Sequence, residues 1–127
     1  MPASDHLHPE QLRNLANQHG DTHFPNFRDP DKRETSRCYD YSEHFSRHCA
    51  QANAKVQPYS FDDDDAHAAN LVSTSKGPYI VDFTYNQFDR NAKVPIVEPR
   101  HQYEKRFKGR EVETYPPYKH EGDITLD

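Results

Sequence analysis

Apolar side chains are scarce in this chain. Of its 127 residues only 32% are hydrophobic, against about 45–50% in a typical soluble domain. A chain of this length forms one domain, but so few apolar residues supply only a small core. We expect that core to be built mainly from the 7 Phe and 8 Tyr residues, because each aromatic side chain buries a large area.

Other shortages exclude whole classes of protein. No apolar run approaches the roughly 18 residues of a membrane span, and the first residues lack the basic start and apolar stretch of a signal peptide. The 4 glycines are too few to favour a Gly-rich phosphate loop. A formal net charge of −5 argues against a nucleic acid partner. We expect a soluble protein, cytoplasmic in the cell that makes it, with neither nucleic acid nor membrane as partner.

Cysteine is also scarce, and Cys38 and Cys49 are too few for a disulfide scaffold. Both lie in 36–52, where apolar residues at three- and four-residue steps predict an amphipathic helix. On a helix, eleven positions separate the two cysteines by about 16 Å, which is beyond the reach of a disulfide. We therefore expect two reduced thiols in a reducing compartment.

The N-terminal part of the chain predicts a helix followed by a loop. Residues 9–18 start with proline and carry an apolar face, and Gly20 is expected to stop this helix. Residues 21–34 are rich in Asp, Pro and Asn, which favours a loop. Phe24 and Phe27 are expected to attach that loop to the core.

The second half of the chain predicts a small sheet. Residues 54–65 end in four aspartates, and we expect a solvated surface loop there. Residues 66–73 and 79–84 predict an antiparallel hairpin. Residues 91–99 contain two prolines and form at most an edge segment, and 100–108 are expected to form a short helix.

These elements predict an α+β fold in which the helix at 36–52 packs on a small antiparallel sheet. We expect a single domain with three parts. Residues 1–34 form its N-terminal helix and loop, 35–108 form its catalytic core, and 109–127 form an extended or loosely ordered tail, because this last segment is rich in proline and charge and has few apolar anchors.

Cys38 is the candidate nucleophile. It falls in the first turn of the predicted helix, where the helix dipole and free backbone N–H groups stabilise a thiolate. Arg37 adds positive charge beside it, and the N–H of Cys38 itself could bind an oxyanion. Cys49, at the other end of the helix, lacks this stabilisation. The alternative is structural, since free cysteine is often buried and Cys38 also begins the apolar stripe.

His67 and Asp82 are candidates for the base and the group that orients it. His67 opens one predicted strand and Asp82 ends its partner, so any register whose paired numbers sum to an odd value places both on one face. A register in which the paired numbers sum to 149 sets His67 and Asp82 directly opposite each other, with Cβ atoms about 5 Å apart, and leaves a four-residue turn. Asp82 would then bind one ring nitrogen and leave the other for Cys38. An incidental histidine and a strand-end charge fit the same positions, because the chain has 9 histidines.

The candidate residues recur within a longer pattern. A helical cysteine is followed four positions later by a small residue, a histidine opens a strand, and Asp-x-Thr is followed by Gln-Phe. Here the residues are Cys38 and Ser42, His67, and Asp82 with Thr84, Gln87 and Phe88. Together with the surrounding stretches 66–72, 77–89 and 94–97, they resemble the papain-fold toxin domains of bacterial polymorphic toxins, which in turn resemble protein-glutamine deamidases. The resemblance covers about residues 35–107.

The resemblance implies a papain-like fold with Cys38, His67 and Asp82 as a catalytic triad. It implies a cysteine-dependent hydrolase that deamidates glutamine side chains of a protein substrate in a target cell, reached through a secretion system, with a cognate immunity protein as partner. Proteolysis and acyl transfer use the same triad and stay open, as does a papain-like binding module without activity. Gln87 and Arg37 are candidates for oxyanion or substrate support, although the Gln87 amide is better suited to holding its loop.

No cofactor or metal is expected. His44 and His48 have a spacing that can bind zinc, but Cys49 points about 100° away from His48 on a helix, and no second ligand pair follows. The run at 62–65 lacks the alternating ligands, the glycine and the final Glu of a calcium loop.

Overall fold

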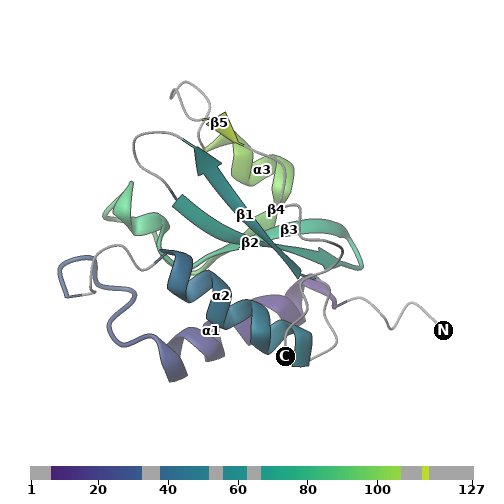
Figure 1. The fold of residues 1–127 in the computed structure, drawn as a ribbon, viewed down its shortest axis with the longest axis horizontal. Helices are drawn as coiled ribbons and strands as arrows, with labels where there is room; N and C mark the ends of the chain where they lie inside the picture. The colour runs from purple at the N-terminus through teal and green to yellow at the C-terminus, as the bar shows by residue number, and fades with distance from the viewer. Residues whose placement is uncertain (1–6, 33–37, 52–55, 63–66, 107–112, 115–127) are drawn as a thin grey trace.

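The computed structural model of the chain describes residues 7–32, 38–51, 56–62, 67–106 and 113–114. The fold is α+β, as the sequence predicts. Helices α1 and α2 cover one face of an antiparallel sheet, and α3 lies on the other side (Figure 1). No helix in the described part of the chain is long and apolar enough to cross a membrane.

The sheet has five strands in the order β4-β3-β2-β1-β5. Strands β1 to β4 follow one another as an antiparallel meander, and β5 returns to pair with β1. In chain order the elements are α1 Pro9–His23, α2 Cys38–Gln51, β1 Val56–Asp62, β2 His67–Thr74, β3 Gly77–Asp82, η2 Tyr85–Gln87, β4 Ile96–Pro99, α3 Arg100–Lys105 and β5 Glu113–Thr114.

The predicted surface loop at 54–65 is wrong, because Val56–Asp62 form β1. This strand pairs with β2 from Val56 to Phe61, and its last residue, Asp62, is the first of the four aspartates. Pro58 cannot donate a ladder hydrogen bond. It lies where β1 has only β2 as a described neighbour, since β5 pairs at Phe61 and Asp62 alone.

The sequence predicts that helix α1 stops at Gly20, but the helix continues to His23. Gly20 serves the packing of the helix against the following loop. A Cβ at this position would lie 2.6 Å from Cζ of the Phe27 ring. The absence of a side chain therefore allows Phe27 to fold back onto α1. Phe24 and Phe27 are both buried, which confirms their predicted role in attaching the loop.

The hairpin is confirmed, but its predicted register is wrong. Asn70 pairs with Val81, and Thr74 pairs with Gly77, so the paired numbers sum to 151 and not to 149. Only Ser75 and Lys76 remain in the turn, where Gly77 adopts a φ of 100° that suits glycine. The register has slipped by two residues, an even number, so each side chain keeps its predicted face.

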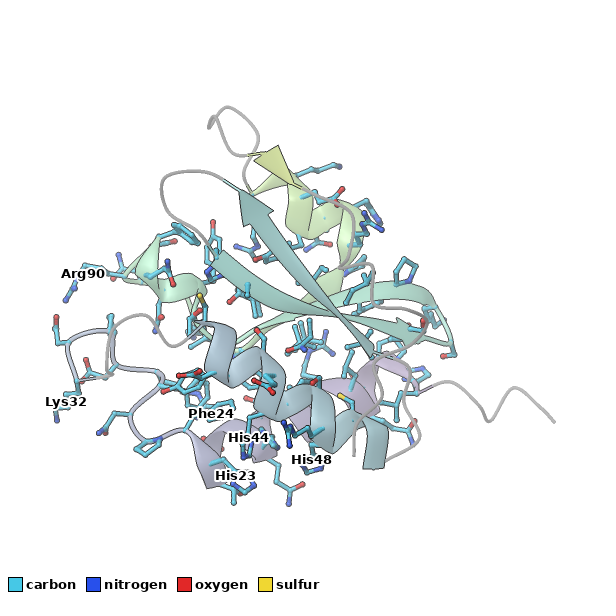
Figure 2. The ribbon with its side chains drawn as sticks, viewed as in Figure 1. His23, Phe24, Lys32, His44, His48 and Arg90 are labelled. Carbon is cyan, nitrogen blue, oxygen red and sulfur yellow. The ribbon has the colours of Figure 1, made fainter. Side chains whose placement is uncertain are left out.

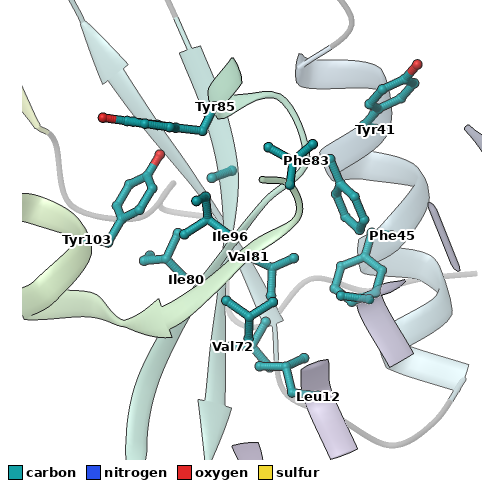
Figure 3. Packing of buried hydrophobic residues seen from close by; sticks show 14 of the residues in the cluster. Leu12, Tyr41, Phe45, Val72, Ile80, Val81, Phe83, Tyr85, Ile96 and Tyr103 are labelled. Carbon is teal, nitrogen blue, oxygen red and sulfur yellow. The ribbon is translucent and has the colours of Figure 1, made fainter. Parts of the chain in front are cut away.

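The core has two halves, one on each side of the sheet (Figure 3). Phe83 is the centre of the half beneath α1 and α2, with its ring centroid 5.0 Å from that of Phe24 and 5.1 Å from that of Phe45. On the other side, Tyr103 of α3 is fully buried. Aromatic side chains thus supply the centre of both halves, as the composition predicts.

The remaining predicted elements are close to those observed. Helix α2 begins at Cys38, within the predicted segment, and β4 is an edge strand of the sheet. Helix α3 is shorter than predicted and ends at Lys105. In the predicted loose tail, Glu113–Thr114 extend the sheet through β1. The other residues of 109–127 lie outside the described part of the chain.

Candidate active site

The candidate site lies at one end of the sheet, where three elements begin or end. Cys38 is the first residue of α2, His67 is the first residue of β2, and Asp82 is the last residue of β3. In Figure 1 the N-terminal end of α2 lies beside the start of β2. The structure thus brings together the three residues that the sequence singles out, from three separate elements.

Asp82 and His67 form a buried pair. Asp82 Oδ2 accepts a hydrogen bond from His67 Nε2 at 2.7 Å, and both side chains have 0% exposure. In the observed register the two residues are diagonal neighbours and do not face each other directly. Diagonal side chains on one face of a sheet are close enough for a long side chain to span the gap. The pair therefore forms despite the two-residue slip.

Two further donors bind the Asp82 carboxylate. The backbone N–H of Thr84 donates to Oδ1 at 2.8 Å, and the hydroxyl of Tyr103 donates to Oδ2 at 2.5 Å. Both carboxylate oxygens are therefore occupied inside the protein, as a buried charge requires. The sequence places Tyr103 only within the short helix expected at 100–108. Nothing in its spacing from Asp82 indicates a contact between them.

Burial and the charge of Asp82 act on the pKa of His67 in opposite directions. Burial alone lowers the pKa of the imidazole, but the negative charge and hydrogen bond of Asp82 outweigh it. The interaction with Cys38 adds to this effect, and the pKa rises to about 9. Because Nε2 binds Asp82, Nδ1 is the ring nitrogen that remains for the thiol. Asp82 and His67 thus form a hydrogen-bonded pair, and Cys38 lies close enough to influence the imidazole.

The two cysteines differ in environment. Both are free thiols. Cys49 is fully buried, and burial raises the pKa of its thiol, which disfavours the reactive thiolate. Cys38 is 4% exposed, begins a helix and has a histidine as partner. Among the two thiols, only Cys38 has the surroundings of a nucleophile.

Neighbouring side chains hold the three elements of the site together. Asn70 in β2 is buried and donates from Nδ2 to the backbone carbonyl of Ser42 in α2 at 2.9 Å. Ser42 is the small residue four positions after Cys38, and it is itself buried. The half-exposed Phe88 lies against His67 with ring centroids 4.8 Å apart. These contacts fix the distance between α2 and β2 and cover part of the imidazole.

The two residues predicted to support substrate or oxyanion have different outcomes. Gln87 ends the short helix η2, where its backbone N–H donates to the carbonyl of Thr84 at 2.9 Å and its side chain is exposed. It lies one residue before Phe88, at the same end of the sheet. Arg37 lies outside the described residues.

A histidine cluster lies away from this site, between α1 and α2 (Figure 2). His19 Nδ1 is 2.8 Å from His48 Nδ1, and His19 Nε2 is 2.8 Å from His44 Nδ1. Each contact is a hydrogen bond between rings, so the nitrogens do not converge on one point. In the part of the chain that the structure describes, no group of His, Cys, Asp or Glu has the arrangement of a metal site.

The sequence singles out His44 and His48 but not His19, which contributes the central ring from the other helix. Its place in the cluster depends on how α1 and α2 pack, and the spacing along either helix does not contain that information.

Comparison of the chain with protein-family models, with curated proteins and with solved structures gave no match.

Proposed function

We propose that this protein is a papain-like cysteine hydrolase that deamidates glutamine side chains of a protein substrate. The observation that supports this proposal is the buried hydrogen-bonded pair of Asp82 and His67, with Cys38 beside it at the first residue of a helix. A nucleophile, a base and a group that orients the base are the parts that acyl-transfer chemistry needs.

In the proposed reaction His67 removes the proton from Cys38, and the thiolate attacks the carboxamide carbon. The tetrahedral intermediate collapses when the C–N bond breaks, and His67 gives its proton to the leaving ammonia. A thioester remains on Cys38. Water, deprotonated by His67, then attacks the thioester carbon, and the C–S bond breaks to release glutamate and the free thiol.

The electrostatics of the site fit the first step of this sequence. Asp82 holds the imidazole by Nε2 and raises its pKa to about 9, so near neutral pH His67 retains the proton that it takes from Cys38, as an ion pair with the thiolate requires. The first backbone N–H groups of α2 have no partner within the helix. In the proposed reaction those at Cys38 bind the oxyanion that forms when the thiolate attacks.

The resemblance to papain-fold toxin domains supplies the biological part of the proposal. On this basis the protein is a toxin or effector domain that acts in a target cell after secretion, and a cognate immunity protein binds it in the cell that makes it.

Mass spectrometry of a target-cell lysate tests the reaction. Incubation with the protein should convert glutamine to glutamate, which increases the mass of the substrate peptide by about one dalton through exchange of NH2 for OH. Cys38→Ala should abolish this conversion. Cys49→Ala is the matched control, because it removes a thiol outside the site, and it should retain the conversion. New peptide termini without any such mass increase would refute deamidation and favour a protease.

The small exposed fraction of Cys38, 4%, favours a second candidate, a papain-like binding module without activity. Thiol labelling at pH 6 separates the two. The proposed hydrolase should be alkylated at Cys38 much faster than at Cys49, since only Cys38 has a base beside it. Slow labelling at equal rates on both cysteines would favour the binding module.

A further inference from the structure

Tyr103 is the only buried side chain of α3, and its hydroxyl reaches the candidate site from the opposite side of the sheet to α2. It donates to Oδ2 of Asp82 at 2.5 Å, and the same oxygen accepts from His67 Nε2 at 2.7 Å. Tyr103, His67 and Asp82 all have 0% exposure. Two donors therefore share one carboxylate oxygen in a place from which water is excluded.

The position of Tyr103 is fixed by the anchoring of α3 to β4. Arg106, which follows the helix, donates from Nε and Nη2 to the carboxylate of Glu98 at 2.6 and 2.8 Å. Gln102 adds a third hydrogen bond to Glu98 at 3.2 Å. Glu98 lies in β4, the strand that pairs with β3. These contacts hold α3 against β4, the neighbour of the strand that carries Asp82, so the Tyr103 hydroxyl has little freedom to leave the carboxylate.

We propose that Tyr103 is a positioning residue, whose hydroxyl fixes the Asp82 carboxylate and competes with His67 for Oδ2. By this competition the Tyr103 hydroxyl limits how strongly Asp82 binds the N–H group of the imidazole. The consequence for catalysis rests on the function proposed above, but the competition itself does not. A His67 that holds its proton too tightly would return to the neutral base more slowly in each cycle.

The competition predicts the direction in which the pKa of His67 changes when the hydroxyl is removed, and a purely structural role predicts the opposite direction. A hydrogen bond to a charged carboxylate is strongest when the carboxylate has no other partner. Tyr103 therefore stabilises Asp82 more when His67 is neutral than when it is charged, and this lowers the pKa of His67. Without the hydroxyl, that pKa should rise. If Tyr103 only filled space, its loss would loosen Asp82 and the pKa of His67 would fall toward its ordinary value of 6.5.

An NMR titration of the His67 ring in Tyr103→Phe measures this sign directly. We expect the pKa of His67 to rise by about half a unit to one unit, the difference between a charged and a neutral hydrogen bond. Tyr79→Phe is the matched control, since Tyr79 lies in the same strand as Asp82 but pairs with Pro99 at the far end. It should leave the titration unchanged.

Fluorotyrosine at position 103 tests the same inference without removing the hydroxyl. Its phenol is more acidic and donates more strongly, so the pKa of His67 should fall below the value in the unmodified protein. This variant keeps the side chain in place even if Tyr103→Phe does not fold. An unchanged titration, or shifts of the same sign in both variants, would overturn the proposal. Slow alkylation of Cys38 in the unmodified protein would instead refute the hydrolase, while the titrations still decide the role of Tyr103.

Discussion

The histidine cluster between α1 and α2 should make the protein unstable in mild acid. A neutral imidazole has one donor and one acceptor, and His19 uses both nitrogens in hydrogen bonds to His48 and His44. A protonated His19 would have two donors and no acceptor, and it would face three other rings. Burial, followed by the charges of His48, His23 and His44, lowers its pKa from 6.5 to about 3.

The size of the effect follows from the two pKa values. Between pH 6.5 and 3 the unfolded chain binds a proton at His19 and the folded chain does not, so stability falls as the pH falls. The slope approaches about 1.4 kcal/mol per pH unit, and integration from pH 7 to pH 5 gives a loss of about 2 kcal/mol. The pKa of His44 is lowered as well, mainly by burial and then by His23 and Arg47, and it contributes in the same direction.

Urea unfolding at pH 7, 6 and 5 measures this loss. His19→Gln cannot titrate, so the difference in unfolding free energy between the natural chain and the variant should shrink by about 2 kcal/mol from pH 7 to pH 5. His101→Gln is the control, because it removes an exposed histidine of α3 that lies outside the cluster. A constant difference for His19→Gln would show that the folded protein already carries a proton on His19 and would refute the reasoning.

Three further changes test the packing and charge of the site. The pKa of His67 is raised to about 9, so its contribution to stability is complete below pH 6.5 and is lost between pH 6.5 and 9. Asp82→Asn should therefore remove the pH dependence of the unfolding free energy over that range. An unchanged slope would contradict the ion pair. Gly20→Ala should lower the unfolding free energy by about 1–3 kcal/mol, because the new Cβ meets the Phe27 ring. Adding Phe27→Leu to the same chain should restore part of the lost stability in thermal melts. Asn70→Asp removes the donor to α2 and buries a charge, so urea titrations should show an unfolding free energy lower by about 3 kcal/mol or more. A decrease below about 1 kcal/mol would refute the role of this contact.

The sequence is sufficient to predict the elements with strong local signals. Helix α2 follows from its apolar stripe, and the hairpin of β2 and β3 follows from two apolar runs around Gly77 and Pro78. Parity also predicts that His67 and Asp82 share a face, because an even slip in register does not change it. These features depend on neighbours in the chain or on the alternation of a strand.

The features that the sequence did not predict depend on distant partners. Strand β1 ends in a segment of high charge, and its pairing with β2 outweighs that composition. Gly20 has the residue type of a helix stop, but the ring of Phe27 explains why it is glycine. Tyr103 reaches Asp82 only because α3 is anchored to β4. In each case the deciding contact is long-range, and one sequence alone does not contain it.

The two-residue turn between β2 and β3 has a consequence for the order in which the site assembles. His67 and Asp82 belong to one hairpin with a short loop, and such local pairings form early and as a unit. Cys38 joins them only when α2 docks, through contacts that include Asn70 and Ser42. The base and its carboxylate thus form one cooperative unit and the nucleophile another. The alkylation rate of Cys38, followed beside hydrogen exchange of the hairpin amides, would therefore report the docking of α2 separately from the folding of the sheet.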